Sequence, residues 1–443
     1  MLMQNFIMCL AIITGAGLLG LSQRDRRFSV MMVVYGSALA AACVIGVVNS
    51  LSSGDPLAPY LADSDGNTYF QEARLLAARG AGNFRELIIT NYAGYQLLLS
   101  VVFMIFGPSL AAGVALNALI FLLAITLLFR ATFLLTGSPN AARSSVLLMM
   151  LTTVNIFYIL MLLKEPALGL SFALLLLAVT KAATQKGLGF WPFVYLAFAL
   201  LIIMSMRTSL LLFLLVLAGF VGPIIARRRS HAVVAFVGAM ILVAPFAQSF
   251  TTYELDASFF TSTIVQNQVI STRFEDGDLS LTGVAGRIIG FYIDQPFYLK
   301  AVLIPIPVGV QILLPFDFWS TRFIEEHFAS FFARNLNPLW YLYVFVWILF
   351  ALTRPRQIPS ILIRRFLYAG AIYYVVVAFI YGGLIPRYGT PALFFLLPAA
   401  GYWWNEATEN RAVRSRARSF FLSYYAVAGL AGAAFVLFQV MRG

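Results

Sequence analysis

Residues 110–130 read LAAGVALNALIFLLAITLLFR, an apolar run that reaches its first charged residue only at Arg130. A helix of about 17–25 such residues is long enough to cross the hydrocarbon core of a bilayer. Similar runs occur on both sides of this one along the whole chain. The repetition predicts an all-α polytopic membrane protein, built as a single integral membrane domain over residues 1–443.

The composition excludes most other classes of protein. Of 443 residues, 61% are hydrophobic and 11% are charged, and the mean hydropathy is +0.87. Because an average soluble domain is about 25% charged, a cytosolic enzyme, a disordered chain and a disulfide-rich secreted scaffold are all excluded. Cys9 and Cys43 lie inside apolar runs and are expected to be buried hydrophobic residues. His231 and His327 are too few and too far apart for a histidine-based zinc site.

The apolar runs predict about 12 or 13 transmembrane helices. They cover residues 3–21, 30–50, 91–107, 110–130, 144–163, 166–180, 189–206, 208–226, 232–250, 337–353, 366–384, 389–404 and 420–440. Residues 91–107 and 110–130 together must cross the membrane once, from outside to inside. Either 91–107 is a re-entrant or tilted piece, which we prefer, or Arg130 lies outside. The stretch 299–316 holds three prolines and is expected to dip into the membrane without crossing it.

The charged residues predict which side of the membrane each connection faces. Six basic clusters separate the runs, and together they hold 18 basic and three acidic residues. The positive-inside rule places them in the cytoplasm, which gives the protein the orientation of a bacterial inner-membrane protein. This orientation places two long loops, at 51–90 and 251–336, on the extracytoplasmic side. A nucleic-acid-binding protein would gather its charge on a soluble face, so no nucleic-acid partner is expected.

Residues that could carry chemistry begin in the first loop, with Asp63-Ser64-Asp65-Gly66. Asp65 and Tyr69 are spaced i, i+4, and Glu72 follows at i+7. If 66–79 is a helix with Asp65 near its N-cap, these three groups share one face. The two aspartates could hold a divalent cation such as Mg²⁺ or Mn²⁺, or one could act as a general base. The plain alternative is a helix cap in a solvated loop.

The surroundings of this loop resemble those of GT-C glycosyltransferases of the protein-mannosyltransferase and aminoarabinose-transferase type. The matching positions are Asp65, Tyr69, Ala73, Leu76, Gly80, Asn91, Tyr92, Gly94, Tyr95, Phe106 and Gly107. The usual acidic pair in that family is Asp-Glu, whereas this chain has Asp63-Ser64-Asp65 and lacks the usual double proline. The resemblance implies an inverting transfer from a polyprenyl-phosphate-linked sugar to a glycan, lipid or protein acceptor, with Asp65 or Asp63 as catalytic base.

Five further positions complete the predicted substrate site, together with Tyr69 and Glu72. Lys164 and Glu165 stand at a corner between two runs, where we expect Lys164 to meet phosphate and Glu165 to bind acceptor or orient the base. Arg207 and Arg387 stand alone at the outer ends of runs, and arginine suits a bidentate phosphate clamp. Tyr388 follows Arg387 in an Arg-Tyr-x-x-Pro pattern that also resembles the family.

Other interpretations stay open for these residues and for the protein. Lys164 and Glu165 could instead form an ion pair that caps a helix, and each arginine could be an interfacial anchor. A polysaccharide polymerase or ligase that acts on diphosphate-linked oligosaccharides would share the topology and the lipid donor. A lipid-saccharide flippase is less favoured, because such a transporter is expected to carry charges in the middle of its spans.

Overall fold

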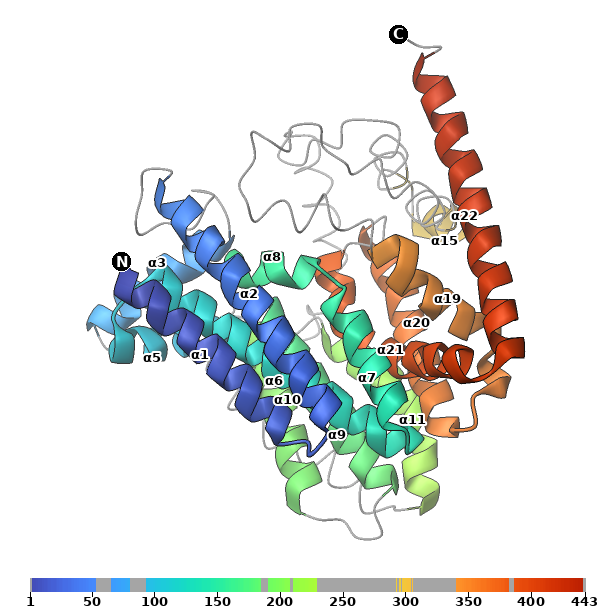
Figure 1. Cartoon of the computed structure of the whole chain (residues 1–443), viewed down its shortest axis with the longest axis horizontal. Helices are drawn as coiled ribbons and strands as arrows, with labels where there is room; N and C mark the ends of the chain where they lie inside the picture. Colours follow the sequence, from blue (N-terminus) through green and yellow to red (C-terminus); the bar gives the residue numbers. More distant parts are fainter. Residues whose placement is uncertain are drawn as a thin grey trace.

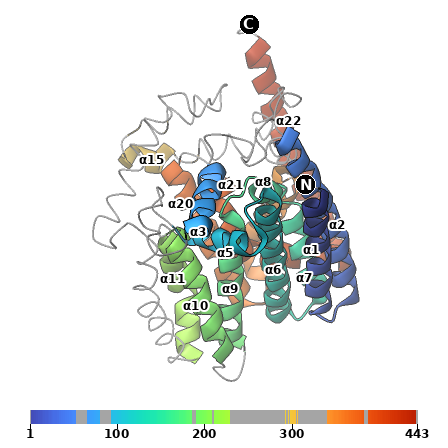
Figure 2. The ribbon, with the colours of Figure 1, turned by 90° about the vertical axis from the view of Figure 1, so that its left-hand side faces the viewer.

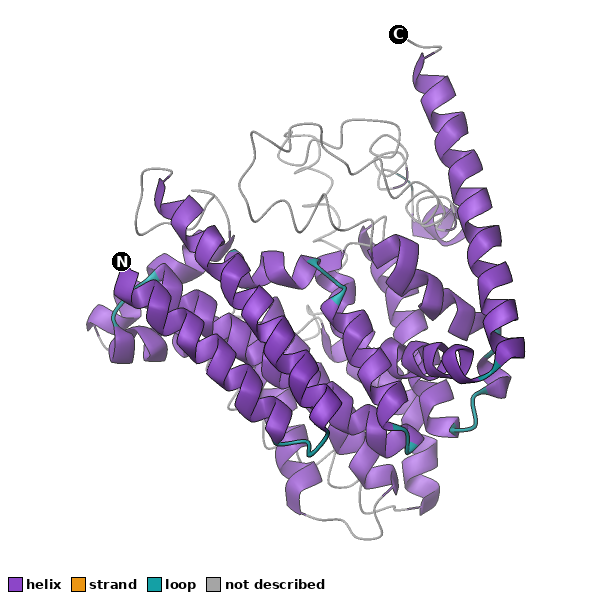
Figure 3. Cartoon of the chain, viewed as in Figure 1, coloured by secondary structure: helices purple, strands orange, loops and turns teal. Residues whose placement is uncertain are grey.

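A computed structural model describes residues 2–52, 65–79, 93–184, 190–207, 210–228, 292, 295, 297–303, 305, 340–381 and 386–440. Within these ranges the chain is helical and no strand occurs (Figure 3). The predicted all-α architecture is therefore confirmed for the described residues. Asp63, the run at 232–250 and most of the second loop lie outside them.

The helices pack into one bundle (Figure 1). In chain order they are α1 (Leu2–Leu21), α2 (Arg26–Ser52), α3 (Asp65–Arg79), α5 (Gly94–Phe106), α6 (Leu110–Thr136), α7 (Pro139–Met150), α8 (Val154–Leu160), α9 (Glu165–Thr184), α10 (Phe190–Met206), α11 (Leu211–Arg228), α15 (Phe297–Leu303), a π-helix (Trp340–Val344), α19 (Phe345–Thr353), a 3₁₀ turn (Pro355–Gln357), α20 (Ile361–Tyr381), α21 (Pro386–Glu409) and α22 (Arg411–Val440).

Four of the described helices are long and apolar enough to cross a membrane. They lie at Met3–Leu21, Arg26–Asn49, Leu110–Thr136 and Glu165–Thr184. Large apolar side chains on the outer surface are more than half exposed, among them Phe6 of α1, Phe106 of α5 and Leu430 of α22. Together with the length and apolar composition of the four helices, this exposure indicates an apolar environment. The protein is thus a polytopic α-helical membrane protein.

The run at 144–163, expected as one straight span, is broken. It forms α7 and α8, which are bent by 59° relative to one another. Polar side chains at the break bond to the backbone: the Thr152 hydroxyl donates to the Leu148 carbonyl at 3.0 Å, and the Asn155 amide donates to the Thr152 carbonyl at 3.0 Å. Such local bonds compete with continued helix, which explains the bend.

The turn between α6 and α7 follows directly from its sequence. Gly137 ends α6 in the left-handed conformation (φ 69°), which only glycine adopts without strain. The Ser138 hydroxyl then accepts a hydrogen bond from the Ala141 N–H, and Pro139 occupies the first turn of α7. α6 therefore extends beyond the run that ends at Arg130, and α7 returns antiparallel beside it.

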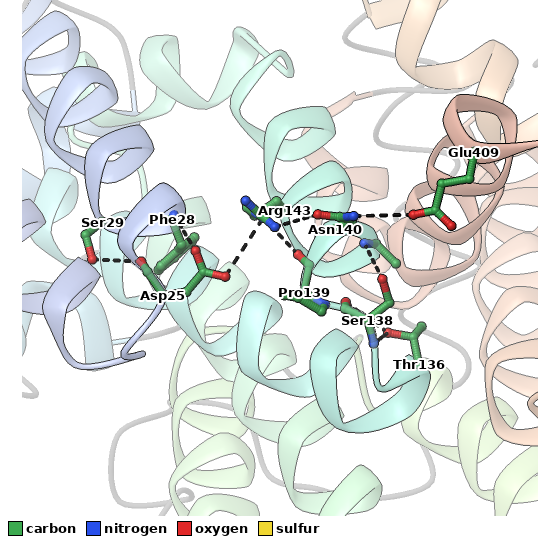
Figure 4. A network of polar contacts seen from close by, with 10 residues as sticks. Asp25, Phe28, Ser29, Thr136, Ser138, Pro139, Asn140, Arg143 and Glu409 are labelled. Atoms are coloured by element: carbon green, nitrogen blue, oxygen red, sulfur yellow. Dashed lines mark hydrogen bonds and ion pairs between the residues drawn. The ribbon is translucent and has the colours of Figure 1, made fainter.

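Polar contacts join three turns at one end of the bundle, called the basic end here (Figure 4). Arg143 of α7 lies 3.9 Å from the Asp25 carboxylate in the α1–α2 turn. Asn140 donates a 3.3 Å hydrogen bond to Glu409 at the end of α21. Three of the predicted cytoplasmic clusters, at residues 24–27, 143 and 411–418, are thereby gathered on one side.

α5 lies at the opposite end of the bundle. Phe103, near its C-terminus, packs edge-on against Phe70 of α3, with ring centroids 5.2 Å apart. Leu99 lies against Gly113 of α6. α5 has 13 residues and rises about 20 Å, which is short of the hydrocarbon thickness of about 30 Å. A re-entrant or tilted piece at 91–107 stays a prediction; α5 is too short to cross the hydrocarbon core as a straight helix, whereas α6 is long enough to do so.

Close helix packing depends on small residues at two crossings. A β-carbon at Gly36 of α2 would clash with Ala16 of α1, and one at Gly401 of α21 would overlap Ser145 of α7. The Ser145 hydroxyl uses this proximity to donate to the Leu397 carbonyl at 3.0 Å. Small residues that let backbones approach are typical of helix packing in membranes.

The orientation can be tested by cysteine labelling. In a chain with Cys9→Ser and Cys43→Ala, we expect Ala78→Cys on α3 to react with a membrane-impermeant maleimide in intact cells. Arg416→Cys at the basic end should react only after permeabilisation. Both positions are exposed on the protein surface, so a difference in labelling reports the side of the membrane and not burial of the cysteine. Labelling of Arg416→Cys in intact cells would overturn the predicted orientation.

Candidate functional site

The site begins with α3, whose bounds agree with the helix expected at 66–79. Asp65 in the first turn and Arg79 in the last turn complement the helix dipole. Tyr69, Phe70, Glu72, Ala73 and Leu76 are buried, and Asp65 is exposed. Tyr69 and Glu72 thus lie on the inner face, and Asp65 stands one turn before Tyr69.

α5 covers the buried face of α3 (Figure 2). The Tyr69 ring packs edge-on against Tyr95, with centroids 5.4 Å apart. Next to it, Gln96 donates a 3.0 Å hydrogen bond to the Glu72 carboxylate. Glu72 is 3% exposed, so this carboxylate fixes α5 on α3 rather than facing open solvent.

A corner between α8 and α9 carries Lys164 and Glu165 into the same region. Leu162 has a positive φ of 50°, which is unusual for a residue with a side chain. The Asn117 amide of α6 donates a 3.0 Å hydrogen bond to the Leu163 carbonyl. The Asn117 oxygen in turn accepts a 3.0 Å bond from the Tyr95 hydroxyl. One side chain of α6 therefore ties the corner to α5.

Lys164 links the corner to α3 and α10. Its ammonium group donates a 2.8 Å hydrogen bond to the carbonyl of Met206, the last residue of α10. The same group lies 5.6 Å from the centroid of the Tyr69 ring, a cation–π distance. A cation at a helix C-terminus is favoured by the helix dipole.

Glu165 and Arg207 form a buried ion pair. Arg207 Nη2 lies 3.4 Å from Glu165 Oε1, and the two residues are 8% and 2% exposed. Glu165 begins α9 and Arg207 directly follows α10, so the pair joins the ends of two helices. Lys164 and Glu165 thus make two separate contacts to the end of α10, Lys164 with the Met206 carbonyl and Glu165 with Arg207; their expected roles toward phosphate and acceptor stay predictions.

Five predicted substrate residues therefore come together in one buried polar cluster: Tyr69, Glu72, Lys164, Glu165 and Arg207. They come from three separate parts of the sequence. In formal charge the two cations and two carboxylates cancel, which is how an apolar bundle tolerates them. Arg387 and Tyr388 belong to the first turn of α21, but their side chains lie outside the described structure, as does Asp63.

Sequence reasoning missed three members of this cluster as site residues, namely Tyr95, Gln96 and Asn117. All three are fully buried. A signal was present for Asn117, because it interrupts the apolar run 110–130 and polar residues inside membrane helices are costly and usually functional. Tyr95 was one of the positions that carry the family resemblance but was not predicted as a site residue, and Gln96 carried no comparable signal.

The divalent-cation hypothesis stays a prediction. Within the described ranges, no three or more His, Cys, Asp or Glu side chains come close enough to hold a metal ion. Asp63, half of the proposed aspartate pair, lies outside these ranges. Asp65 alone supplies one exposed carboxylate.

Comparisons with protein-family models, with curated proteins and with solved structures found no match for this chain.

The Asn117 contacts predict a stability effect. Asn117→Leu keeps the volume but leaves the buried Leu163 carbonyl and Tyr95 hydroxyl without this partner. We expect a loss of about 1–3 kcal/mol, measured by unfolding in mixed detergent. Thr126→Val on the same helix is the control, because the Thr126 hydroxyl only bonds back to the Leu122 carbonyl. Equal losses in both variants would contradict a special role for Asn117.

The buried ion pair predicts a strongly non-additive double-mutant cycle. Glu165→Leu alone leaves the Arg207 charge without this carboxylate and should destabilise the protein by about 3–5 kcal/mol. The double variant Glu165→Leu/Arg207→Met should recover most of that loss, because no charge is then left in the pair. The unfolding midpoints of Glu165→Leu, Arg207→Met and the double variant are compared. If the loss in the double variant equals the sum of the two single losses, the two residues are not coupled.

Proposed function

We propose that the protein is an integral membrane glycosyltransferase that uses a polyprenyl-phosphate-linked sugar, with a GT-C-like architecture of about 12 or 13 spans. The observation that carries the proposal is the gathering of Tyr69, Glu72, Lys164, Glu165 and Arg207 in one buried cluster, in which Tyr69 follows the exposed Asp65 by one helical turn. The sequence pattern favours this chemistry for the same residues, and they lie at the end of the bundle opposite the basic end.

In the proposed reaction, Asp65 or Asp63 accepts the proton of an acceptor hydroxyl. The resulting oxygen nucleophile attacks the anomeric carbon from the face opposite the phosphate, so the configuration inverts. The bond from that carbon to the phosphate oxygen breaks, and the lipid phosphate leaves with the electron pair. Positive charge near the phosphate stabilises this departure without a proton donor.

The cations have unequal parts in this scheme. Lys164 already donates to the Met206 carbonyl and Arg207 already pairs with Glu165, so both cations are held in place at the floor of a cluster with no net formal charge. Arg387 with Tyr388, at the start of α21, is proposed to contact the phosphate directly, where a bidentate guanidinium fits best. No cofactor is required by the scheme, although Mg²⁺ or Mn²⁺ at Asp63 and Asp65 stays an alternative use of those carboxylates.

The proposed setting is a bacterial-type inner membrane with the site facing the periplasm, in synthesis of a cell-envelope glycan. The charge asymmetry along the sequence supports this orientation. The donor is a lipid that enters sideways from the bilayer, and the acceptor is a glycan, a lipid or a protein. A polymerase or ligase that uses diphosphate-linked oligosaccharides is the second candidate within the same proposal.

Transfer by the purified full-length protein tests the proposal. We expect label to move from one member of a panel of radiolabelled polyprenyl-phosphate sugars to an acceptor, and Asp65→Asn to lower this rate about 10²–10⁴-fold. Its melting temperature should be unchanged, because Asp65 is exposed. One added sugar indicates a monosaccharide transferase, whereas a ladder from diphosphate-linked oligosaccharides indicates a polymerase.

Two matched variants sharpen the outcome. Glu409→Gln removes an exposed carboxylate at the basic end and should retain full activity. Asp63→Asn should be milder than Asp65→Asn if Asp65 is the base. If Asp63→Asn is inactive and Asp65→Asn is not, the base is Asp63. Normal transfer in both aspartate variants would contradict the role of this loop.

A further inference from the structure

A surface groove runs between α1 and α2 at the basic end, far from the candidate site. Its volume is about 580 Å³, within the range of about 300–1,000 Å³ that is usual for small-molecule sites. Figures 1 and 2 place α1 and α2 side by side along one edge of the bundle. The groove therefore opens on the surface that faces lipid.

The walls of the groove are apolar. Leu21 of α1 and Val30 and Val34 of α2 line it, and each is more than half exposed. Gly17 forms part of its floor: a β-carbon there would meet only a methyl group of Val33, at 3.9 Å. The lining of the groove rises about 12 Å along α2 from Arg26 to Val34, which suits a headgroup phosphate and the upper part of an acyl chain.

The mouth of the groove is basic. Arg24 and Arg26 line it, both are exposed, and neither has an ion-pair partner among the described residues. The acidic residue between them is engaged elsewhere: the Asp25 carboxylate accepts a 2.8 Å hydrogen bond from the Phe28 N–H and lies near Arg143 (Figure 4). Two guanidinium groups therefore face this mouth with no described carboxylate to neutralise them.

We propose that this groove binds an anionic phospholipid of the leaflet at the basic end. The phosphate lies between Arg24 and Arg26, since guanidinium groups match phosphate oxygens bidentately. The acyl chain lies along Leu21, Val30 and Val34. A free phosphate would leave these apolar walls uncovered, and an apolar helix of another protein would bury the two arginines without an anion. This inference does not depend on the glycosyltransferase proposal.

Native mass spectrometry of the full-length protein in detergent tests the site, with phosphatidylglycerol and phosphatidylcholine as probes. We expect saturable binding of phosphatidylglycerol at least tenfold tighter than that of phosphatidylcholine. Arg24→Gln/Arg26→Gln should weaken it about 20-fold, since each arginine near an anionic headgroup contributes roughly fivefold. The control Arg356→Gln/Arg416→Gln removes two exposed charges from other basic clusters and should change binding less than twofold.

A second variant tests the acyl-chain part. Gly17→Leu places a side chain on the floor, where its β-carbon meets only the Val33 methyl group at 3.9 Å, and should weaken phosphatidylglycerol binding at least fivefold at an unchanged melting temperature. Glycerol 3-phosphate, which has no acyl chain, should not displace the lipid at 100-fold excess. Equal binding of the two lipids, full binding by the Arg24/Arg26 variant, equal loss in the control, or displacement by glycerol 3-phosphate would each overturn the proposal.

Discussion

The hydrogen bond from the Asn117 amide to the Leu163 carbonyl, 3.0 Å long and fully buried, holds the arrangement of the candidate site together. The corner before α9 contains Leu162 at positive φ, a conformation that costs roughly 1–3 kcal/mol unless surrounding contacts enforce it. Asn117 supplies one such contact, and the packing of Leu162 on Gly113, one turn earlier on α6, supplies another. With the corner fixed, Lys164 and Glu165 reach the end of α10.

A second constraint on the structure is that each charged side chain buried in the apolar bundle needs an opposite charge or a hydrogen-bond partner. Arg207 meets Glu165, Lys164 meets the Met206 carbonyl, and Glu72 accepts from Gln96, so these charged groups have described partners. These contacts hold the side chains at the floor of the site in place. Of the two carboxylates on α3, Glu72 is buried among them and Asp65 is exposed. The proposed function would use Asp65 as the base beside this floor and would rely on Arg387 to stabilise the phosphate leaving group.

The sequence predicted elements whose signals are local. The helix at α3 follows from its polar pattern and the acidic residue at its start, and the spans α1, α2, α6 and α9 follow from apolar length. The bend between α7 and α8 was missed because hydropathy does not register that Thr152 and Asn155 bond to the backbone. The partners of Glu165 and Asn117, 42 and 46 residues away, depend on how helices pack, which no local pattern contains.

A structure of the full-length protein with a bound polyprenyl-phosphate sugar would test whether the cluster around Tyr69 and Lys164 is the floor of a sugar-transfer site. We expect the anomeric carbon to face Asp65 or Asp63, and the phosphate to lie at the end of the bundle that holds Lys164, Arg207 and Arg387. Density for the donor phosphate at the basic end, or an anomeric carbon remote from both aspartates, would contradict the proposed function.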